Sequence, residues 1–141
     1  MKTRGRIPFP WPDRLADWID GAVPEIAELG GVRGIRLIAC ARLPFDWLPG
    51  DRGAYEGITL WRRIYLRDRL CPLDAGDRGD VELLLHELIH VLQFRRSPLL
   101  FPLRYLLGLA VHGYDRHPAE REAKVRGAEL AAAYWRECAV R

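Results

Sequence analysis

"VELLLHELIHVLQF", residues 81–94, is an almost wholly aliphatic run that nevertheless contains His86, Glu87, His90 and Gln93. Its aliphatic residues fall on all sides of a helix, so the helix is predicted to be buried over most of its circumference. Residues four apart lie on one face of a helix, which stacks His86 above His90. The stretch therefore predicts a core helix with two imidazoles directed at one point of the interior.

The segment "HELIH" within this run is an HExxH motif. Two neutral imidazole nitrogens beside a carboxylate suit a divalent zinc ion. In this chemistry His86 and His90 bind the metal, and Glu87 acts as general base toward a zinc-activated water. The competing interpretation is a pair of core histidines satisfied by hydrogen bonds, with the spacing arising by accident. The apolar setting of the motif favours the zinc site.

A catalytic zinc site needs a third protein ligand, and "HGYDRHPAEREA", residues 112–123, offers two carboxylates. The face that Glu120 shares is small and apolar: Ala123, Gly127, Ala131, Tyr134 and Cys138. The face of Glu122 is more polar, so Glu120 is predicted to point inward and to complete the site. Without a metal, a carboxylate in the first turn of a helix would still be favoured by the helix dipole.

Four further polar residues are candidates for supporting roles. His112 and His117 lie in the turn before the last helix and are weaker ligand candidates, and His117 suits a helix cap equally well. Tyr114, in the same turn, is our candidate for stabilising an oxyanion, with packing under the helix start as the alternative. Gln93 lies one turn beyond His90, where it can hydrogen-bond a ligand residue or the substrate, and we expect such a supporting role rather than direct contact with the metal.

Hydrophobic spacing and chain breakers predict an α+β fold in a single domain, residues 1–141. We expect an N-terminal helix, a small and mostly antiparallel sheet, and three helices. The expected segments are a helix over 15–29 that is kinked or split at Pro24, a strand within 32–40, a loop over 43–57, a hairpin or one bulged strand around Arg62 and Arg63, a helix capped by Asp80 and ending near Arg96, a short helix over 102–110, and a last helix from Pro118 to about Cys138.

Composition limits the function classes. The 141 residues are 49% hydrophobic and 29% charged, which is typical of a globular protein. The net charge is +3, but the arginines are scattered, which argues against nucleic-acid binding. The three cysteines form no CxxC pair, so neither a disulfide framework nor a thiolate metal site is expected. Neither a signal peptide nor a membrane span is evident, and a cytoplasmic location is the simplest expectation.

"HELIHVLQF" followed by "YDRHPAEREA" resembles the gluzincin metallopeptidases, in which a glutamate from a later helix completes HExxH. More narrowly, it is similar to small bacterial HExxH domains of unknown function found in core proteins of extracellular contractile injection systems. Those domains have HExxHxxQ and later an Asn-Pro-x-Glu-x-Glu-Ala-like segment, where this chain has His117 in place of Asn. "GAYEGITLWRRIYL" is similar to the strand that precedes their metal helix. The resemblance covers about Gly53 to Lys124.

The resemblance implies a zincin-like fold and a zinc-dependent metallopeptidase acting on a peptide or protein. It makes His86, His90 and Glu120 the zinc ligands and Glu87 the general base. It also implies that the strand before the metal helix pairs with an extended substrate, through residues such as Ile58, Leu60 and Trp61. The alternative function is a non-catalytic module that keeps zinc as a structural or binding centre. An acid beside the ligands, Glu87, favours catalysis, because a structural site has no use for it.

Overall fold

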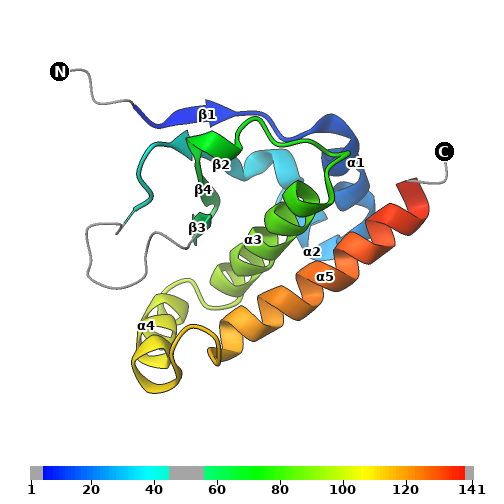
Figure 1. Ribbon diagram of the computed structural model, residues 1–141. Coiled ribbons are helices and arrows are strands. Elements are labelled where there is room, and N and C mark those ends of the chain that lie inside the picture. The colour runs from blue at the N-terminus through cyan, green and yellow to red at the C-terminus, as the bar shows by residue number, and fades with distance from the viewer. Residues whose placement is uncertain (1–4, 45–55, 139–141) are drawn as a thin grey trace.

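The computed structural model describes residues 5–44 and 56–138, and it confirms the predicted α+β class (Figure 1). The described residues form five α-helices and a four-stranded sheet. The elements are β1 (Ile7–Phe9), α1 (Asp13–Ala22), α2 (Pro24–Ala27), the 3₁₀ helix η1 (Val32–Gly34), β2 (Arg36–Cys40), β3 (Gly57–Leu60), β4 (Arg63–Arg67), the 3₁₀ helix η3 (Asp68–Leu70), α3 (Arg78–Arg96), α4 (Leu100–His112) and α5 (Pro118–Cys138).

The sheet has the strand order β1-β2-β4-β3. β1 pairs with β2 and β3 pairs with β4 in antiparallel fashion, whereas β2 and β4 are parallel. The sheet is therefore mostly antiparallel, as predicted. β1 was not predicted, because three residues with a central proline give no detectable alternation. Pro8 is tolerated there because β1 is an edge strand, where a missing N–H removes no central ladder bond.

The hairpin predicted before the metal-motif helix is present as β3 and β4, but its turn lies one residue earlier than expected, at Trp61 and Arg62. Trp61 has a φ of 55°, which is uncommon for a bulky residue. Tertiary contacts hold it there. Its indole Nε1 donates to the Pro98 carbonyl at 2.9 Å, and its ring centroid lies 5.1 Å from that of Phe94.

α3 is the central element of the fold (Figure 1). It packs between the sheet and α5, and α1 and α2 complete the same core. Its residues Leu84, Leu85, Leu88 and Ile89 are among the largest fully buried side chains. The predicted burial of residues 81–94 is thus confirmed, with Glu82 exposed and Leu83 and His86 partly exposed. Both ribbon views place α4 at the end of the molecule away from β1 and α1.

The structure confirms some of the predicted helix boundaries and corrects others. The first helix is split before Pro24, as one of the two expected alternatives. The N-cap of α3 is Asp77 rather than Asp80, because the Asp77 carboxylate accepts a bond from the Asp80 N–H at 2.9 Å. α4 extends beyond the predicted 102–110, since a proline in the first turn, Pro102, costs no helical hydrogen bond. α5 spans Pro118–Cys138, as predicted.

Two further expectations concern the predicted loop and membrane-spanning helices. Most of the loop predicted over 43–57 falls on residues 45–55, which lie outside the described residues. Within the described ranges, none of the helices combines the length and apolar character required to cross a membrane.

Candidate metal centre

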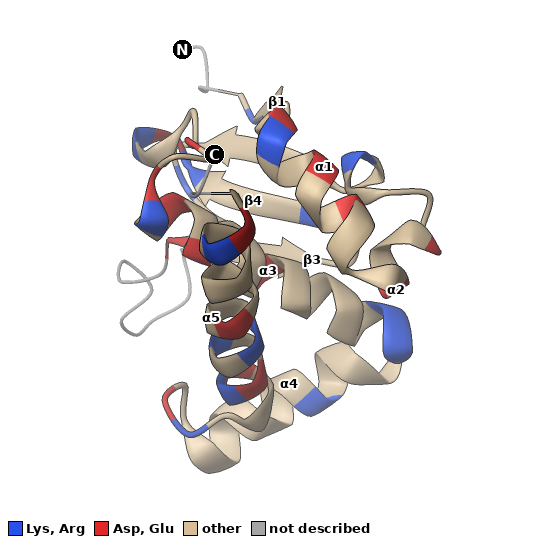
Figure 2. Ribbon diagram, turned by 90° about the vertical axis from the view of Figure 1, so that its right-hand side faces the viewer, with Lys and Arg blue, Asp and Glu red and all other residues tan. Residues whose placement is uncertain are grey.

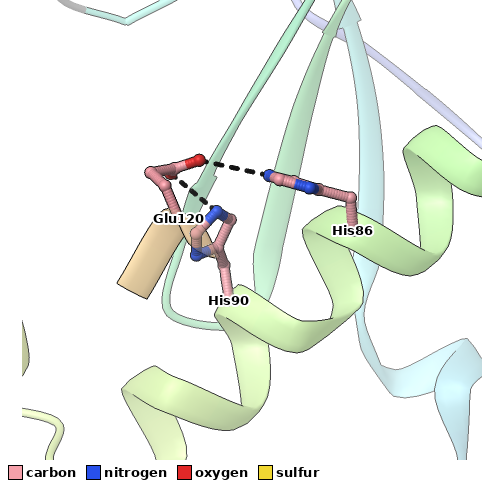
Figure 3. Close-up of side chains that lie close together, drawn as sticks. All are labelled: His86, His90 and Glu120. Atoms are coloured by element: carbon pink, nitrogen blue, oxygen red, sulfur yellow. Dashed lines mark hydrogen bonds and ion pairs between the residues drawn. The ribbon is translucent and has the colours of Figure 1, made fainter. Parts of the chain in front are cut away.

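His86 and His90 lie one turn apart on α3, with ring centroids 5.0 Å apart and ring planes at 75°. The side chain of His90 is 8% exposed and that of His86 is 20% exposed. Both rings turn toward the N-terminal end of α5 (Figure 3). The i, i+4 spacing thus gives the convergence that the sequence predicts, and solvent reaches the pair on the side of His86.

Glu120 on α5 meets both rings (Figure 3). Its Oε2 lies 3.2 Å from His86 Nε2, and its Oε1 lies 2.8 Å from His90 Nε2. The side chain is 8% exposed, so the carboxylate is inside the protein, as predicted. One donor atom from each of His86, His90 and Glu120 lies within 4.8 Å of the other two. The residues therefore form a compact cluster of two nitrogens and one oxygen.

Close packing of α5 on α3 brings Glu120 to the histidines. The face of α5 that carries Glu120 is buried at Ala123, Gly127, Ala131 and Tyr134. A Cβ at Gly127 would lie 3.1 Å from both the backbone nitrogen and the Cα of His86. A glycine at this crossing, seven residues after Glu120 in α5, thus permits close backbone contact between the two helices.

The cluster shifts the pKa values of its members in opposite directions. Burial lowers the pKa of His90, but the hydrogen bond with Glu120 and the negative charge of Glu87 outweigh it and raise the pKa to about 9. Burial raises the pKa of Glu120, yet hydrogen bonds with His86 and His90 hold that pKa well below its ordinary value. The carboxylate is therefore ionised at neutral pH. A divalent cation between Glu120 and His90 would replace the proton that they share.

A hydrogen-bonded chain fixes the orientation of the His90 ring. Gln93 Nε2 donates to the Ala119 carbonyl at 3.0 Å and to Glu122 Oε1 at 2.8 Å, so the amide oxygen of Gln93 faces His90. That oxygen lies 2.7 Å from His90 Nδ1, which must therefore carry a proton and donate. His90 Nε2 then faces Glu120 and is the ring nitrogen directed into the cluster. The structure thus shows a hydrogen bond between Gln93 and His90, with the imidazole as donor.

Glu87 lies on α3 between the two histidines and is 5% exposed. It takes no part in the three-residue cluster. Its Oε2 accepts a hydrogen bond from the Thr59 hydroxyl on β3 at 2.7 Å, and its backbone carbonyl lies 3.1 Å from the same hydroxyl. A Cβ at position 57 would lie 3.4 Å from Glu87 Oε1 and 2.8 Å from Leu66 Cδ2, so Gly57 keeps space beside that oxygen. The acid is thus fixed against the edge strand.

The weaker ligand candidates lie outside the cluster. His117 Nδ1 accepts from the Ala119 N–H at 3.0 Å, which makes His117 the cap of α5. Its Nε2 donates to the Tyr105 carbonyl at 2.8 Å, so both ring nitrogens are engaged. His112 is exposed at the end of α4. Glu122 binds Gln93 and pairs with Arg96 at 3.4 Å instead of entering the cluster.

The phenol that contacts the cluster belongs to Tyr105 and was missed by the sequence analysis. Its hydroxyl donates to Glu120 Oε1 at 2.9 Å. Tyr105 stacks on His117 with ring centroids 4.3 Å apart, and a Cβ at Gly108 would lie 2.6 Å from His117 Nε2. Tyr114, the predicted oxyanion residue, lies in the turn before α5 with its side chain 37% exposed. Its role stays a prediction.

The predicted substrate residues lie on and beside the edge strand β3. Ile58 and Leu60 pack with Tyr65 on the sheet face opposite Thr59 and α3. Leu60 and Trp61 line an open hollow of about 490 Å³ together with Gly34, Arg36, Arg62, Arg63 and Tyr65. These side chains therefore flank the edge without contacting the cluster.

The donor set matches what zinc binds in catalytic proteins, namely two imidazole nitrogens and one carboxylate oxygen. A tetrahedral ion with bonds of about 2.1 Å holds its ligand atoms about 3.4 Å apart. The distances of 2.8 and 3.2 Å join the two histidines to different oxygens of Glu120, and one donor atom from each residue lies within 4.8 Å of the other two, so a bound ion would require a modest shift of these side chains. The donor set carries one negative charge, that of Glu120, and so attracts a cation.

Comparison with known proteins supplies no relative. No protein-family model matches the chain, and neither the search of curated proteins nor the search of solved structures found a significant match.

Proposed function

We propose that this protein is a zinc-dependent peptidase in which His86, His90 and Glu120 bind the metal and Glu87 is the general base. The observation that carries the proposal is the pairing of a three-donor cluster with a second acid, Glu87, which lies outside the cluster on the helix of the two histidines. Three protein ligands leave room for water and substrate at the metal, and a nearby carboxylate can exchange protons with both.

The residues of the site have distinct roles in this proposal. When bound, zinc would lower the pKa of a water molecule and polarise the carbonyl of the substrate. Glu87 accepts a proton from the attacking water and delivers it to the leaving nitrogen as the C–N bond breaks. Oε2 of Glu87 already accepts a hydrogen bond from the Thr59 hydroxyl. We therefore assign proton transfer to Oε1 of Glu87, which lies beside Gly57. Gln93 holds the His90 ring in its ligand orientation.

The edge strand β3 supports a peptide as substrate. Arg67 N–H donates to the Glu56 carbonyl at 3.2 Å, and antiparallel pairing then turns the backbone groups of Ile58 and Leu60 toward β4. The N–H and C=O groups of Gly57 and Thr59 face the other way, where no described strand pairs with them. An extended peptide that paired with the Thr59 backbone would run beside Glu87, because the Thr59 hydroxyl is bonded to that carboxylate.

The second candidate is a non-catalytic zinc module. The burial of Glu87 and its bond to Thr59 are compatible with a structural acid that only ties α3 to β3. The peptidase is preferred because a structural zinc site closes its fourth position with protein. Among the described residues, no fourth histidine, cysteine, aspartate or glutamate belongs to the cluster.

The test separates zinc binding from hydrolysis. We expect zinc-loaded wild-type protein to generate new amino termini in a proteome-derived peptide library, detected by mass spectrometry. Glu87→Gln removes the base but leaves the three ligands in place. It should retain about one zinc per chain and lower the cleavage rate by about 10²–10⁴-fold.

The matched control is Glu82→Gln, which makes the same change at an exposed position of α3. It should cleave at the wild-type rate. If Glu87→Gln cleaves as fast as Glu82→Gln, Glu87 is not the base. If the wild type binds zinc and cleaves no peptide in the library, the non-catalytic module is the better assignment.

A further inference from the structure

α4 exposes an unusual amount of aliphatic surface. The structure leaves no residue of this helix buried. Six aliphatic side chains on it or just before it are between 54% and 82% exposed: Leu99, Leu100, Leu103, Leu106, Leu107 and Val111. Monomeric proteins rarely expose a continuous apolar patch of this kind unless it meets a partner or a membrane. We call these six residues the α4 patch.

The α4 patch covers one side of α4, and the other side contacts the rest of the protein. Leu100, Leu103, Leu107 and Val111 follow the i, i+3, i+7, i+11 spacing of a single helical face. The opposite side carries Phe101, whose ring lies 4.7 Å from that of Phe94, and Tyr105, which binds Glu120. Packing against the rest of the protein therefore fixes which side of α4 faces outward.

α4 itself carries no acidic residue, and Asp115 directly precedes Arg116 in the turn after it. No Asp or Glu occurs between Glu87 and Asp115 in the sequence. Arg104 lies at the border of the patch on α4, and Arg116 lies in the turn that follows the helix. Both are exposed, and neither has a carboxylate partner in the described part of the chain. Figure 2 shows α4 as a mostly uncharged ribbon, in contrast to the alternating charges along α5.

A second copy of the chain fits the α4 patch poorly. The α4 patch has six residues, whereas each side of a standard interface contributes about 20–30 residues, so two copies meeting through this patch alone would form a small interface. A two-fold contact would also bring the patch of one copy, with its Arg104, against the same patch of the other. A phospholipid surface suits both the exposed leucines and the neighbouring arginines. Leucine side chains insert among the acyl chains, and arginine side chains pair with the phosphates.

We propose that α4 docks in the interfacial layer of an anionic phospholipid bilayer. The helix is shorter than the roughly 30 Å hydrocarbon core, so it lies along the surface with Leu103 and Leu107 directed inward. Arg104 and Arg116 reach the headgroup phosphates. Because the other side of α4 carries Tyr105, the His86, His90 and Glu120 cluster then lies directly behind the docked helix. The docking itself does not depend on the peptidase proposal.

Vesicle co-sedimentation tests the docking. Wild-type protein should bind vesicles of phosphatidylcholine and phosphatidylserine (7:3), and bind pure phosphatidylcholine more weakly. Leu103→Gln with Leu107→Gln changes only exposed side chains and should weaken binding by about tenfold or more. Val125→Gln, at a 56% exposed position on α5, is the matched control and should bind like the wild type. Arg104→Gln should weaken binding only to the anionic vesicles.

Three outcomes would overturn the proposal. The first is that wild-type protein binds neither kind of vesicle. The second is that the double leucine variant binds as well as Val125→Gln. The third is a wild-type dimer in light scattering that the double variant converts to a monomer, since this would assign the α4 patch to a second copy. Vesicle binding is measured without zinc or peptide. The docking proposal can therefore be tested whether or not the peptidase proposal holds.

Discussion

At the scale of single residues, the chain Glu122–Gln93–His90 controls which imidazole nitrogen faces Glu120. Histidine ligands in metal sites commonly donate their second N–H to a neighbouring acceptor, which fixes ring and tautomer. Here the acceptor is an amide oxygen, and the amide is itself oriented by two bonds from its nitrogen, to Glu122 and to the Ala119 carbonyl. Residues from both α3 and α5 thus orient the His90 nitrogen that faces Glu120.

We predict that Gln93→Ala lowers zinc affinity by about 10–100-fold, because His90 loses the acceptor that fixes its ring. Competition titration against a chelator measures this affinity. Glu122→Gln should have a smaller effect, since a glutamine at 122 still accepts from the Gln93 amide. A Gln93→Ala protein with wild-type zinc affinity would show that this hydrogen bond supports the fold alone, which urea unfolding of the same variant would report.

Residue-scale prediction succeeded where helical geometry alone sets the direction of a side chain. The convergence of His86 and His90 and the inward direction of Glu120 follow from spacing along one helix. Tyr105 and Thr59 could not be found in this way. Each reaches the site from another element, and their contacts depend on how α4 packs beside α5 and how β3 packs against α3.

At the scale of elements, the crossing of α3 and α5 sets the position of Glu120. We predict that Gly127→Val destabilises the protein by about 1–3 kcal/mol, because its side chain would press on the His86 backbone. It should also weaken zinc binding, since separation of the helices moves Glu120 away from His86 and His90. Urea unfolding and chelator competition measure the two effects.

Gly21→Ala is the control for this substitution, because Gly21 is helical and a Cβ there meets nothing within 4 Å. It should leave zinc affinity unchanged and stability equal or slightly higher. If Gly127→Val matches Gly21→Ala in both measurements, the close contact between α3 and α5 does not determine the geometry of the cluster.

Element-scale prediction was most accurate for long periodic helices and least accurate where tertiary contacts override local preference. The end of α3 and both ends of α5 agree with the sequence pattern. The β3–β4 turn does not, because Trp61 adopts a left-handed conformation that its contacts with Pro98 and Phe94 stabilise. β1 depends on pairing with β2 and has no local signal of its own.

At the scale of the whole molecule, the two surfaces for which we propose functions share one end of the fold. α3, α5, α4 and β3 surround the cluster of His86, His90 and Glu120, and the outer side of α4 carries the α4 patch. The sheet, α1 and α2 supply the core that holds α3 in place. The sequence predicted the α+β class and the cluster, but it could not predict the exposed patch. An apolar helix has the same composition whether it is buried or not.

Zinc content is the most direct test of the central claim. Protein expressed with supplemented zinc, then dialysed, should contain about one zinc per chain by inductively coupled plasma mass spectrometry. Glu120→Ala should lose the metal, whereas Glu129→Ala, the same change at an exposed position of α5, should keep it. A wild type without zinc, or a Glu120→Ala protein that retains as much zinc as Glu129→Ala, would contradict the assignment of His86, His90 and Glu120 as a zinc site.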